Sequence, residues 1–589
     1  MDDIKHIDDP LFKSEVREGM RVDWDVPIEM DDGVVLRANV YRPDDDGQYP
    51  VIMAHGPYGK DLHFEEIYKT CWDLMCENHP DVPAGSTNIH QAWEVADPEK
   101  WVPHGYVLVR VDSRGAGRSP GYLEHFNARE TKDFYDCIEW GGVQPWSNGK
   151  VGLSGISYYA INQWQVAALR PPHLAAICPW EGSTDYYREG SYHGGIYSTF
   201  AKHWYDMQIK QLQHGYGDRG YRSRANGEWS AGPETLSDEE LEANKFDLHA
   251  TMRAHPLDDE WFADRAVDYS QIEVPILSCG NWGGAPLHPR GNFHGYMLSG
   301  SKEKYLEVHG LEHWSLYYTD YGNDLQMRFF DCYLKGDDSG WKDQPRVSLN
   351  VRHPGEKFVP RAEEDWPLPR TEWTKFHFEP AGQILSDAPA SEKAEITYQA
   401  MGDGLTFLSN PAAEDTEICG PMAVKLHVSS DTRDADMFVI LRVFQPDMKE
   451  VTFRGALDPH TPVASGWLRA SHRKLDPARS EEWAPFHAHD EVQALTPGEI
   501  YELDIEIHGS GIVVPKGYRF GLSIRGCDYV YPGEPNAGLS NMKNVFTGVG
   551  PFLHDDETDR PPEVFDNNVT VHLGGDHAGY VLLPIIPAK

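Results

Sequence analysis

The run Val151-Gly-Leu-Ser-Gly155-Ile-Ser157-Tyr158-Tyr159-Ala160 begins as an apolar strand, breaks at a glycine, presents a serine and continues as a predicted helix. A tight turn from strand to helix exposes the Ser157 hydroxyl, and the first N–H groups of the helix point toward negative charge that develops beside it. This pattern favours a nucleophile elbow. The alternative is a strand end at which Ser157 only caps the helix. The rest of the chain has to decide between the two interpretations.

Short apolar runs alternate with helical stretches between residues 35 and 180. This order predicts an α/β fold with a mainly parallel sheet that helices cover on both faces. In such sheets ligands bind beyond the carboxyl ends of the strands, which is where Ser157 would lie. The expected strands are Val35–Tyr41, Val51–Ala54, Tyr106–Val111, Val151–Leu153 and Ala175–Pro179, and the expected helices are Thr131–Trp140 and Tyr158–Leu169.

The strand pattern stops between about 188 and 265. There Ser198–Gln213 is typical of a helix, and Ser237-Asp-Glu-Glu240 is a capping box that opens another helix. Strands return at Pro275–Cys279 and Tyr305–Val308. We therefore expect one sheet domain formed by residues 1–187 and 266–344, with residues 188–265 inserted as a helical cap over the strand ends.

After about residue 345 apolar and polar residues alternate in short runs that Pro-, Gly- and Asp-rich turns separate. This alternating pattern predicts an antiparallel sandwich or jelly roll over residues 345–589. The expected strands include Val424–Ser429, Met437–Phe444, Tyr501–His508, Tyr518–Arg525 and Val569–Leu573.

The composition excludes some classes of partner. A chain of 589 residues is expected to form two or three domains. Its 93 acidic residues against 53 basic ones give a formal charge of −40, which argues against binding to nucleic acid or to anionic membranes. The N-terminus shows no signal-peptide pattern and no segment has the length of a membrane span, so we expect a cytoplasmic protein. The eight scattered cysteines resemble buried thiols, and their spacing matches no metal site. The oligomeric state is left open, a homo-oligomer included.

A second motif, Asp112-Ser-Arg-Gly-Ala-Gly-Arg-Ser-Pro-Gly121, directly follows the strand at 106–111. Its glycines permit a close-packed loop, and its Arg and Asp side chains can hold that loop by charge-assisted hydrogen bonds. Together with Gln144-Pro-Trp-Ser-Asn-Gly-Lys150 and the Ser157 turn, this loop closely resembles the cocaine esterase and X-prolyl dipeptidyl-peptidase family of α/β-hydrolases.

The resemblance continues through the helical insertion and, at Arg469-Ala-Ser-His-Arg473 and Leu503-Asp-Ile-Glu-Ile507, into the all-β region. It implies an α/β-hydrolase sheet, a serine nucleophile at Ser157, a small-molecule substrate, and no metal or organic cofactor. The family pattern has glycine where this chain has Ala160. Because alanine is small, we expect the turn to survive.

An acyl-transfer enzyme needs donors for the oxygen that becomes negative in the transition state. After the strand at 51–54 the chain reads His55-Gly-Pro-Tyr58-Gly-Lys60. The family places a tyrosine hydroxyl donor here, so the resemblance assigns Tyr58 to the oxyanion hole. The backbone N–H of Tyr158 is the expected second donor. The alternative for Tyr58 is a packing role in a Pro-Gly turn.

The general base is expected after the last strand of the sheet. His309 and His313 both follow the run Tyr305-Leu-Glu-Val308. The resemblance aligns the family histidine with His313, and places His309 where the family has glycine. We therefore assign His313 as the base and expect His309 to make local hydrogen bonds.

The acid is where this sequence departs from the family. The family aspartate of a Gly-Trp-x-Asp pattern is replaced by Gly284, in Gly280-Asn-Trp-Gly-Gly284. Without an acid the base would lose its orientation and the partner that stabilises its charge. We expect Glu181, at the carboxyl end of the strand 175–179, to take this role. Glu312, beside the base, is the rival, and Asn281 is a weaker third candidate that orients without balancing charge.

The leading hypothesis is a serine carboxylic-ester hydrolase that acts through an acyl-enzyme. The first alternative is an amide hydrolase of the X-prolyl dipeptidyl-peptidase or β-lactam acylase type, which would need cap carboxylates such as Asp185 and Glu189 to bind a free amine. The second alternative is a non-catalytic binding protein on a decayed scaffold. Aromatic residues of the cap suggest an apolar pocket, although core packing explains them equally well: Trp204, Tyr205, Tyr216 and Tyr221.

Overall fold

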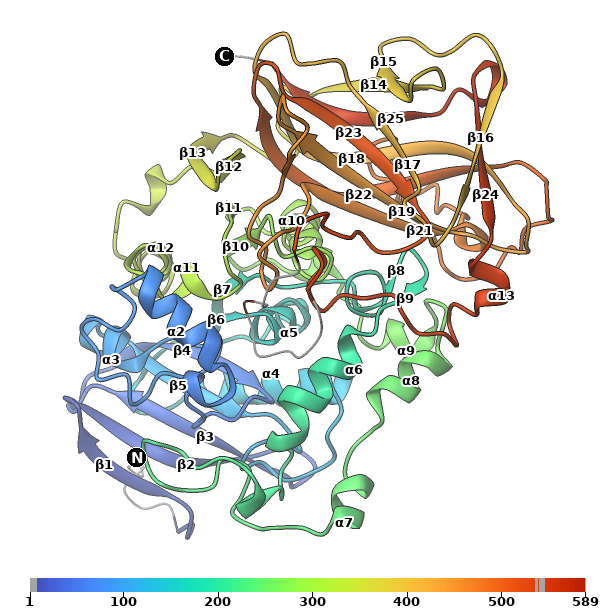
Figure 1. The fold of residues 1–589 in the computed structure, drawn as a ribbon. Helices are drawn as coiled ribbons and strands as arrows, with labels where there is room; N and C mark the ends of the chain where they lie inside the picture. The colour runs from blue at the N-terminus through green and yellow to red at the C-terminus, as the bar shows by residue number, and fades with distance from the viewer. Residues whose placement is uncertain (1–7, 535–538, 540–545, 588–589) are drawn as a thin grey trace.

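A computed structural model describes residues 8–534, 539 and 546–587. Its first part is a twisted sheet with helices on both sides, drawn from blue through green to yellow in Figure 1. Neighbouring strands follow the order β1–β2–β3–β5–β4–β6–β7–β10–β11–β12–β13. The strands from β5 to β12 are parallel, while β1, β2, β3 and β13 run antiparallel to their neighbours. This confirms the mainly parallel sheet.

The strands of this sheet are β1 Lys13–Arg17, β2 Met20–Glu29, β3 Val35–Arg42, β4 Tyr49–Gly56, β5 Val107–Asp112, β6 Ser147–Ile156, β7 Leu174–Trp180, β10 Ile276–Asn281, β11 Lys304–His309, β12 Val347–His353 and β13 Lys357–Glu363. The accompanying helices are α1 Phe64–Ile67, α2 Lys69–Asn78, α3 Pro98–Trp101, α4 Ala128–Gly142, α5 Tyr158–Ala168, α10 Pro289–Leu298, α11 Ser315–Tyr318 and α12 Asp320–Phe330. Each strand expected between residues 35 and 308 is present within a few residues of its expected bounds.

The order of the strands determines where the candidate active site lies. β4 precedes β5 in the sequence, but in the sheet β4 lies between β5 and β6. The central strands are therefore β4, β6, β7 and β10. All four run parallel, and their carboxyl ends therefore meet at one edge. The turns after β4, β6, β7 and β10 carry Tyr58, Ser157, Glu181 and Gly284, respectively.

Residues 188–265 form short helices and turns beside this edge, drawn in green in Figure 1. Ser237 caps its helix through the predicted capping box. The helix expected over 198–213 is broken: α6 is regular, a wider π turn follows at 205–209, and a tighter 3₁₀ turn at 210–212. The elements are β8 Tyr192–His193, β9 Ile196–Tyr197, α6 Phe200–Trp204, α7 Asp238–Ala243, α8 Leu248–Ala254 and α9 Glu260–Ala263.

The second part of the chain is mostly β and has its own apolar core (Figure 1). Long antiparallel pairs dominate it, such as β18 with β22 and β19 with β23. The jelly-roll connectivity stays a prediction. The elements are β14 Glu372–Glu379, β15 Ile384–Ser386, β16 Ala394–Gln399, β17 Leu405–Leu408, β18 Thr416–Ser430, β19 Asp436–Phe444, β20 Glu450–Val451, β21 Ala464–Arg469, β22 Tyr501–Val514, β23 Arg519–Arg525, α13 Pro562–Phe565, β24 Asn568–Leu573 and β25 Tyr580–Ile586.

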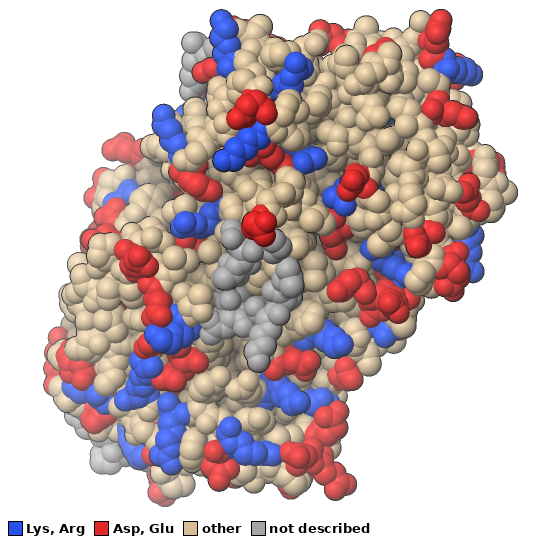
Figure 2. Space-filling model, in the orientation of Figure 1, with Lys and Arg blue, Asp and Glu red and all other residues tan. Residues whose placement is uncertain are grey.

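The surface is mixed in charge on the face shown in Figure 2, where acidic and basic side chains lie interspersed among neutral ones. Within the described ranges, none of the helices combines the length and the apolar character that a membrane crossing requires.

Candidate active site

Ser157 occupies a sharp turn between β6 and α5. Its φ of 55° lies in the left-handed region that non-glycine residues rarely adopt, which is the strain expected of a nucleophile elbow. A side chain at Gly155 would come within 2.4 Å of the Cβ atom of Tyr159, so the turn requires a glycine there. Among the described residues the Ser157 hydroxyl makes no capping bond to α5; instead, its Oγ atom lies 3.1 Å from Nε2 of His288.

The turn survives with Ala160 in place of the family glycine. The space for its methyl group is provided by Gly182, where an added Cβ atom would lie 2.6 Å from that of Ala160. Gly182 directly follows Glu181. The two departures from the family pattern, at Ala160 and at the acid, are thus neighbours in space.

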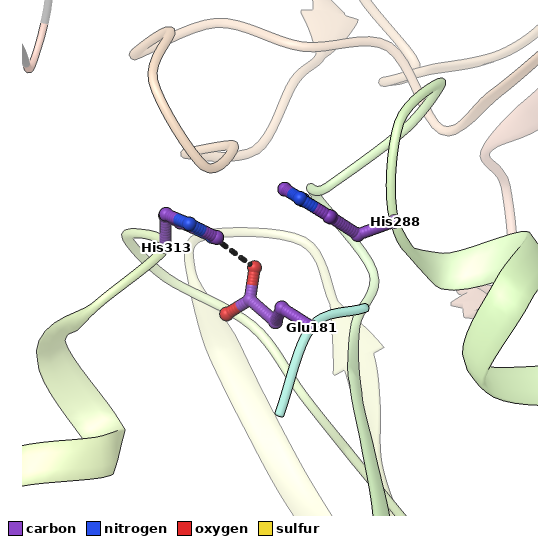
Figure 3. A group of neighbouring side chains, drawn as sticks. All are labelled: Glu181, His288 and His313. Carbon is purple, nitrogen blue, oxygen red and sulfur yellow. Dashed lines mark hydrogen bonds and ion pairs between the residues drawn. The ribbon is translucent and has the colours of Figure 1, made fainter. Parts of the chain in front are cut away.

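Glu181 and His313 are brought together, as Figure 3 shows. Oε2 of Glu181 lies 2.7 Å from Nδ1 of His313, and both side chains are buried. The other oxygen, Oε1, lies 3.1 Å from Nε2 of His309 and 3.2 Å from the Asn281 amide nitrogen. Burial opposes the charge on Glu181, but the two imidazoles outweigh it and lower the pKa of Glu181 to about 2. Glu181 is therefore an ionised carboxylate with three hydrogen-bond partners.

A second carboxylate, Glu94, lies on the opposite side of the His313 ring. Its Oε1 atom is 3.1 Å from Nε2 of His313, and its backbone oxygen accepts a 3.0 Å bond from the Ile156 N–H beside the elbow. Burial raises the pKa of Glu94 to about 7, which the His313 contact only partly offsets. Burial opposes protonation of His313 too, but Glu181 and Glu94 outweigh it and raise the pKa of His313 to about 10.

His288 directly precedes α10, and its ring stacks on that of His313 with centroids 4.8 Å apart and planes 7° from parallel (Figure 3). Burial lowers the pKa of His288 well below 6.5, so its imidazole is neutral. Its Nδ1 atom has no hydrogen-bond partner in the described part of the chain. His288 thus contacts Ser157, the candidate nucleophile, but lacks the carboxylate that His313 has.

Glu94 and His288 were not predicted from the sequence. Glu94 lies in a long irregular segment without a motif. The signal for His288 is its place in the run Leu287-His288-Pro289, directly after the loop at Gly284 that should carry the family acid.

The ligand atoms of Glu181, His288 and His313 lie within 4.8 Å of one another, as in a metal site. A metal ion binds in the plane of each imidazole, along the nitrogen lone pair. Because the two rings are stacked and nearly parallel, their lone pairs do not converge on one point. The arrangement fits a hydrogen-bonded pair with a stacked neighbour better than a metal centre.

Tyr58 is buried in the turn after β4, and its hydroxyl accepts a 3.0 Å bond from the indole N–H of Trp204. Burial raises the pKa of Tyr58 well above 10, so the hydroxyl keeps its proton. The predicted Asp112 loop holds this turn in place: the two carboxylate oxygens of Asp112 accept bonds from the Lys60 N–H at 2.7 Å and the Arg118 N–H at 2.8 Å. The N–H of Tyr158 lies in the first turn of α5, where helix geometry supplies no acceptor.

A cavity opens at Ser157, with about 80 Å³ accessible to the centre of a water-sized sphere. It is lined by the elbow, the cap and the C-terminal half of the chain, and its walls are mainly aromatic and aliphatic. Of the four cap aromatics named above, only Trp204 is among its lining residues. The walls include Tyr58, Trp93, Phe126, Tyr158, Tyr186, Phe200, Trp204, Leu457 and Phe552, and Glu94 is the only carboxylate among the described lining residues.

The other acidic candidates are occupied elsewhere. Glu312 is buried against Arg454, whose Nη1 atom lies 2.7 Å from its Oε1. Asp185 pairs with Arg188 at 2.9 Å, and Glu189 pairs with Arg290 at 2.9 Å. Within the described residues, Asp185 and Glu189 are not part of the cavity wall.

The loop at Gly283 and Gly284 is packed against the C-terminal half. A side chain at Gly283 would meet the Gly455 backbone at 2.5 Å, and the Ala456 N–H donates to the Gly283 oxygen at 2.9 Å. The backbone oxygen of Ala456 in turn accepts a 3.2 Å bond from the His313 N–H. Backbone from the C-terminal part of the chain therefore packs against Gly283, whereas a side chain at Gly284 would meet Asn281, His288 and Pro289 of its own segment.

Two family models match consecutive parts of the chain. The X-Pro dipeptidyl-peptidase (S15 family) matches residues 32–315. The X-Pro dipeptidyl-peptidase C-terminal non-catalytic domain matches residues 339–581.

Individual relatives extend over most of the chain. A CocE/NonD family hydrolase from Staphylococcus aureus has a crystal structure that superposes with a TM-score of 0.84, at 32% identity over 99% of this chain and 98% of that one. Cocaine esterase of Rhodococcus sp. (strain MB1 Bresler) is 24% identical over 95% of this chain and 98% of its own. A putative Xaa-Pro dipeptidyl-peptidase of Rhodopirellula baltica is 21% identical over 83% of this chain and 79% of its own.

Proposed function

Because the chain belongs to the CocE/NonD hydrolases of the X-Pro dipeptidyl-peptidase (S15) family and is a serine hydrolase, we propose that it cleaves small carboxylic esters through an acyl-enzyme at Ser157. The observation that carries the proposal is the strained elbow at Ser157 beside a buried, ionised Glu181 bound to His313. A nucleophile, a base and the group that orients the base are thereby collected at one end of an apolar cavity.

In the first half-reaction, Ser157 Oγ attacks the ester carbonyl carbon while Nε2 of His313 accepts the hydroxyl proton. The carbonyl oxygen becomes negative and is stabilised by the Tyr58 hydroxyl and the Tyr158 N–H. Because the Tyr58 oxygen already accepts a bond from Trp204, its own proton is free to point at this oxyanion. The tetrahedral intermediate then expels the alcohol, which takes the proton from His313 and leaves an acyl-enzyme.

In the second half-reaction, water attacks the acyl carbon and gives its proton to His313. The intermediate collapses to the free acid as His313 returns a proton to Ser157 Oγ. Glu181 stays ionised throughout, since it holds Nδ1–H of His313 and stabilises the imidazolium. Its low pKa fits this role.

In the resting arrangement Ser157 Oγ contacts His288, while Nε2 of His313 contacts Glu94. We assign His313 as the base because a carboxylate bonds its Nδ1 atom, a partner that His288 lacks among the described residues. Rotation of the Ser157 side chain toward the stacked ring of His313 would bring nucleophile and base together. His288 then holds the nucleophile between turnovers.

The two histidines can be separated by substitution. We expect His313→Asn to lower kcat/KM by roughly 10⁴-fold and His288→Asn to lower it by no more than about tenfold, the value of one neutral hydrogen bond. Both are measured with phenyl acetate, and thermal unfolding serves as the check on folding. The reverse order of effects would assign the base to His288.

The cavity favours esters with an apolar or aromatic acyl group, since aromatic side chains form most of its wall. Recognition of a free amine is less well supported because Asp185 and Glu189 are paired with arginines outside the wall, and Glu94 is engaged by His313. Amide cleavage is the second candidate because several relatives carry the name Xaa-Pro dipeptidyl-peptidase.

The test has two parts. A fluorophosphonate probe should label the wild-type protein and fail to label Ser157→Ala, which should also lose turnover of phenyl acetate. Phenyl acetate should then be compared with an aminoacyl-prolyl arylamide. Faster turnover of the amide would overturn the ester assignment, and undiminished activity of Ser157→Ala would overturn the mechanism.

A further inference from the structure

The acid of the proposed triad is held by two imidazoles rather than one. His313 contacts Oε2 of Glu181 at 2.7 Å, and His309 contacts Oε1 at 3.1 Å. His309 is the last residue of β11 and is fully buried, with its ring 5.1 Å from that of Trp180.

The other nitrogen of His309 also faces a carboxylate. Nδ1 lies 2.7 Å from Oε2 of Glu307, which is buried on the same strand. Because an ionised carboxylate only accepts hydrogen bonds, both ring nitrogens donate and the imidazole carries a positive charge. Burial opposes that charge, but Glu307 and Glu181 outweigh it and raise the pKa of His309 to about 9.

Glu307 has partners of its own beyond His309. Its Oε1 atom accepts bonds of 3.1 Å from the Tyr321 hydroxyl and from the Asn350 amide. A continuous chain of hydrogen bonds therefore runs from His313 through Glu181, His309 and Glu307 to Tyr321, which is 46% exposed. Glu307 is thereby held by donors that lie outside the active site.

We propose that His309 and Glu307 form a buried ion pair that acts through Glu181 to set how readily His313 takes up and releases the proton of the reaction. His309 and Glu307 are positioning residues, since neither contacts the reacting atoms. The inference rests on the proposed function, in which His313 is the base.

The electrostatic argument gives the two residues opposite effects. Negative charge on Glu181 favours the proton on His313, and positive charge on His309 offsets part of it. Removing the charge of His309 should make His313 hold its proton to higher pH. Removing the charge of Glu307 leaves His309 uncompensated, so His313 should lose its proton at lower pH.

Other titratable groups face this chain from the neighbouring elements. Glu94 and His288 lie on the active-site side, and both interact electrostatically with Glu181. The Cys279 thiol of β10 and the Tyr321 hydroxyl of α12 lie near Glu307. None of these four is altered in the variants below, so their contributions remain as a constant background.

The experiment compares His309→Gln, Glu307→Gln and the double variant. Glutamine in place of His309 retains an amide N–H that reaches Glu181 but removes the charge, and glutamine in place of Glu307 is isosteric. We expect the acidic limb of kcat/KM for phenyl acetate to move up by roughly 1 pH unit in His309→Gln and down in Glu307→Gln. The double variant should shift less than His309→Gln alone. His309→Leu, which removes charge and hydrogen bond together, should also lower kcat at its pH optimum.

A purely structural role predicts something different: both single variants lose thermal stability while their pH profiles coincide with the wild type or move in the same direction. Either result overturns the inference. If His309→Gln fails to fold, the pH profile of Glu307→Gln alone tests the inference. A downward shift of its acidic limb supports the inference, and an unshifted or upward limb overturns it. Failure of the proposed function is recognised separately, because the fluorophosphonate probe would then fail to label the wild type, or Ser157→Ala would retain full activity.

Discussion

The two sides of the His313 ring present two buried glutamates whose pKa values are shifted in opposite directions. Glu181, at the end of β7, has two imidazoles and an amide around it, and its pKa falls to about 2. Glu94 lies in the segment before α3. Its Oε1 atom contacts His313, its Oε2 atom has no hydrogen-bond partner among the described residues, and its pKa rises to about 7. Both are buried, so the number of donors decides in which direction the pKa of the carboxylate moves. One glutamate can therefore orient the base, while the other competes with Ser157 for the same ring.

The largest expected effect comes from removing the charge on the Glu181 side. Glu181→Gln should lower kcat/KM for phenyl acetate by roughly 10⁴-fold, because His313 loses both its orientation and the counter-charge of its imidazolium. Glu312→Gln is the matched control, since Glu312 is equally buried and adjacent in sequence to His313 but pairs with Arg454. Near wild-type activity in the first variant with collapse in the second would reverse the assignment of the acid.

The second effect comes from the Glu94 side and concerns pH. In the wild type the two carboxylates raise the pKa of His313 to about 10, so the base form becomes populated only as pH rises toward that value. Glu94→Gln removes one of the two charges, and the acidic limb of kcat/KM should move down by roughly 1 to 2 pH units. Activity at pH 8, where Glu94 is ionised in the wild type, should rise relative to the wild type.

Two outcomes would contradict this reading of Glu94. An unchanged pH profile would show that its carboxylate does not control the proton on His313. An equal loss of kcat/KM at every pH would instead make Glu94 a group that contacts substrate. Glu312→Gln serves again as the control and should leave the profile in place.

A smaller effect is expected from the donors around Glu181. Asn281→Ala removes the amide bond to Oε1 of Glu181 and should lower kcat/KM by roughly tenfold, the value of one hydrogen bond to a charged group. Ser315→Ala is the control because it removes a buried donor from Glu312 at 3.1 Å and leaves Glu181 untouched. A loss of equal size in both variants would show that any buried polar deletion has this consequence.

The smallest effect, none, is expected from a chelator. Incubation with 1,10-phenanthroline should leave kcat/KM unchanged, since the parallel rings of His288 and His313 do not direct their lone pairs to one point. A loss of activity that zinc restores would make Glu181 a metal ligand. The low pKa of Glu181 would then have to be explained by a metal ion and not by its hydrogen-bond donors.

The sequence predicted those parts of the site that lie at the ends of regular elements. Ser157, Glu181 and His313 follow β6, β7 and β11, and parallel strands bring their carboxyl ends to one edge, so proximity follows from topology alone. The proposal that Glu181 replaces the missing acid used only its place after β7, and the structure puts it 2.7 Å from His313.

What the sequence could not supply lies in irregular segments. Glu94 reaches the ring of His313 from a loop whose path depends on the packing of Trp93 against Phe64 and Tyr68. No periodicity encodes such a contact. The strands β12 and β13 were missed in a similar way. The pairing of β12 with β11 is a long-range contact between segments on either side of α12, and β13 joins the sheet only through β12.

The backbone bonds from Ala456 to Gly283 and to His313 bear on how this chain can be divided. Family matches split it between residues 315 and 339, and the second part is described as non-catalytic. Yet the loop that carries the base rests on residues 454–456, and Arg454 neutralises the buried Glu312 next to it. A catalytic half expressed alone would leave that carboxylate unpaired and the base without its support. Replacing the C-terminal domain of this chain by that of a relative would therefore exchange part of the proposed catalytic centre, and a functional chimera would have to keep residues 454–456 together with the hydrolase half.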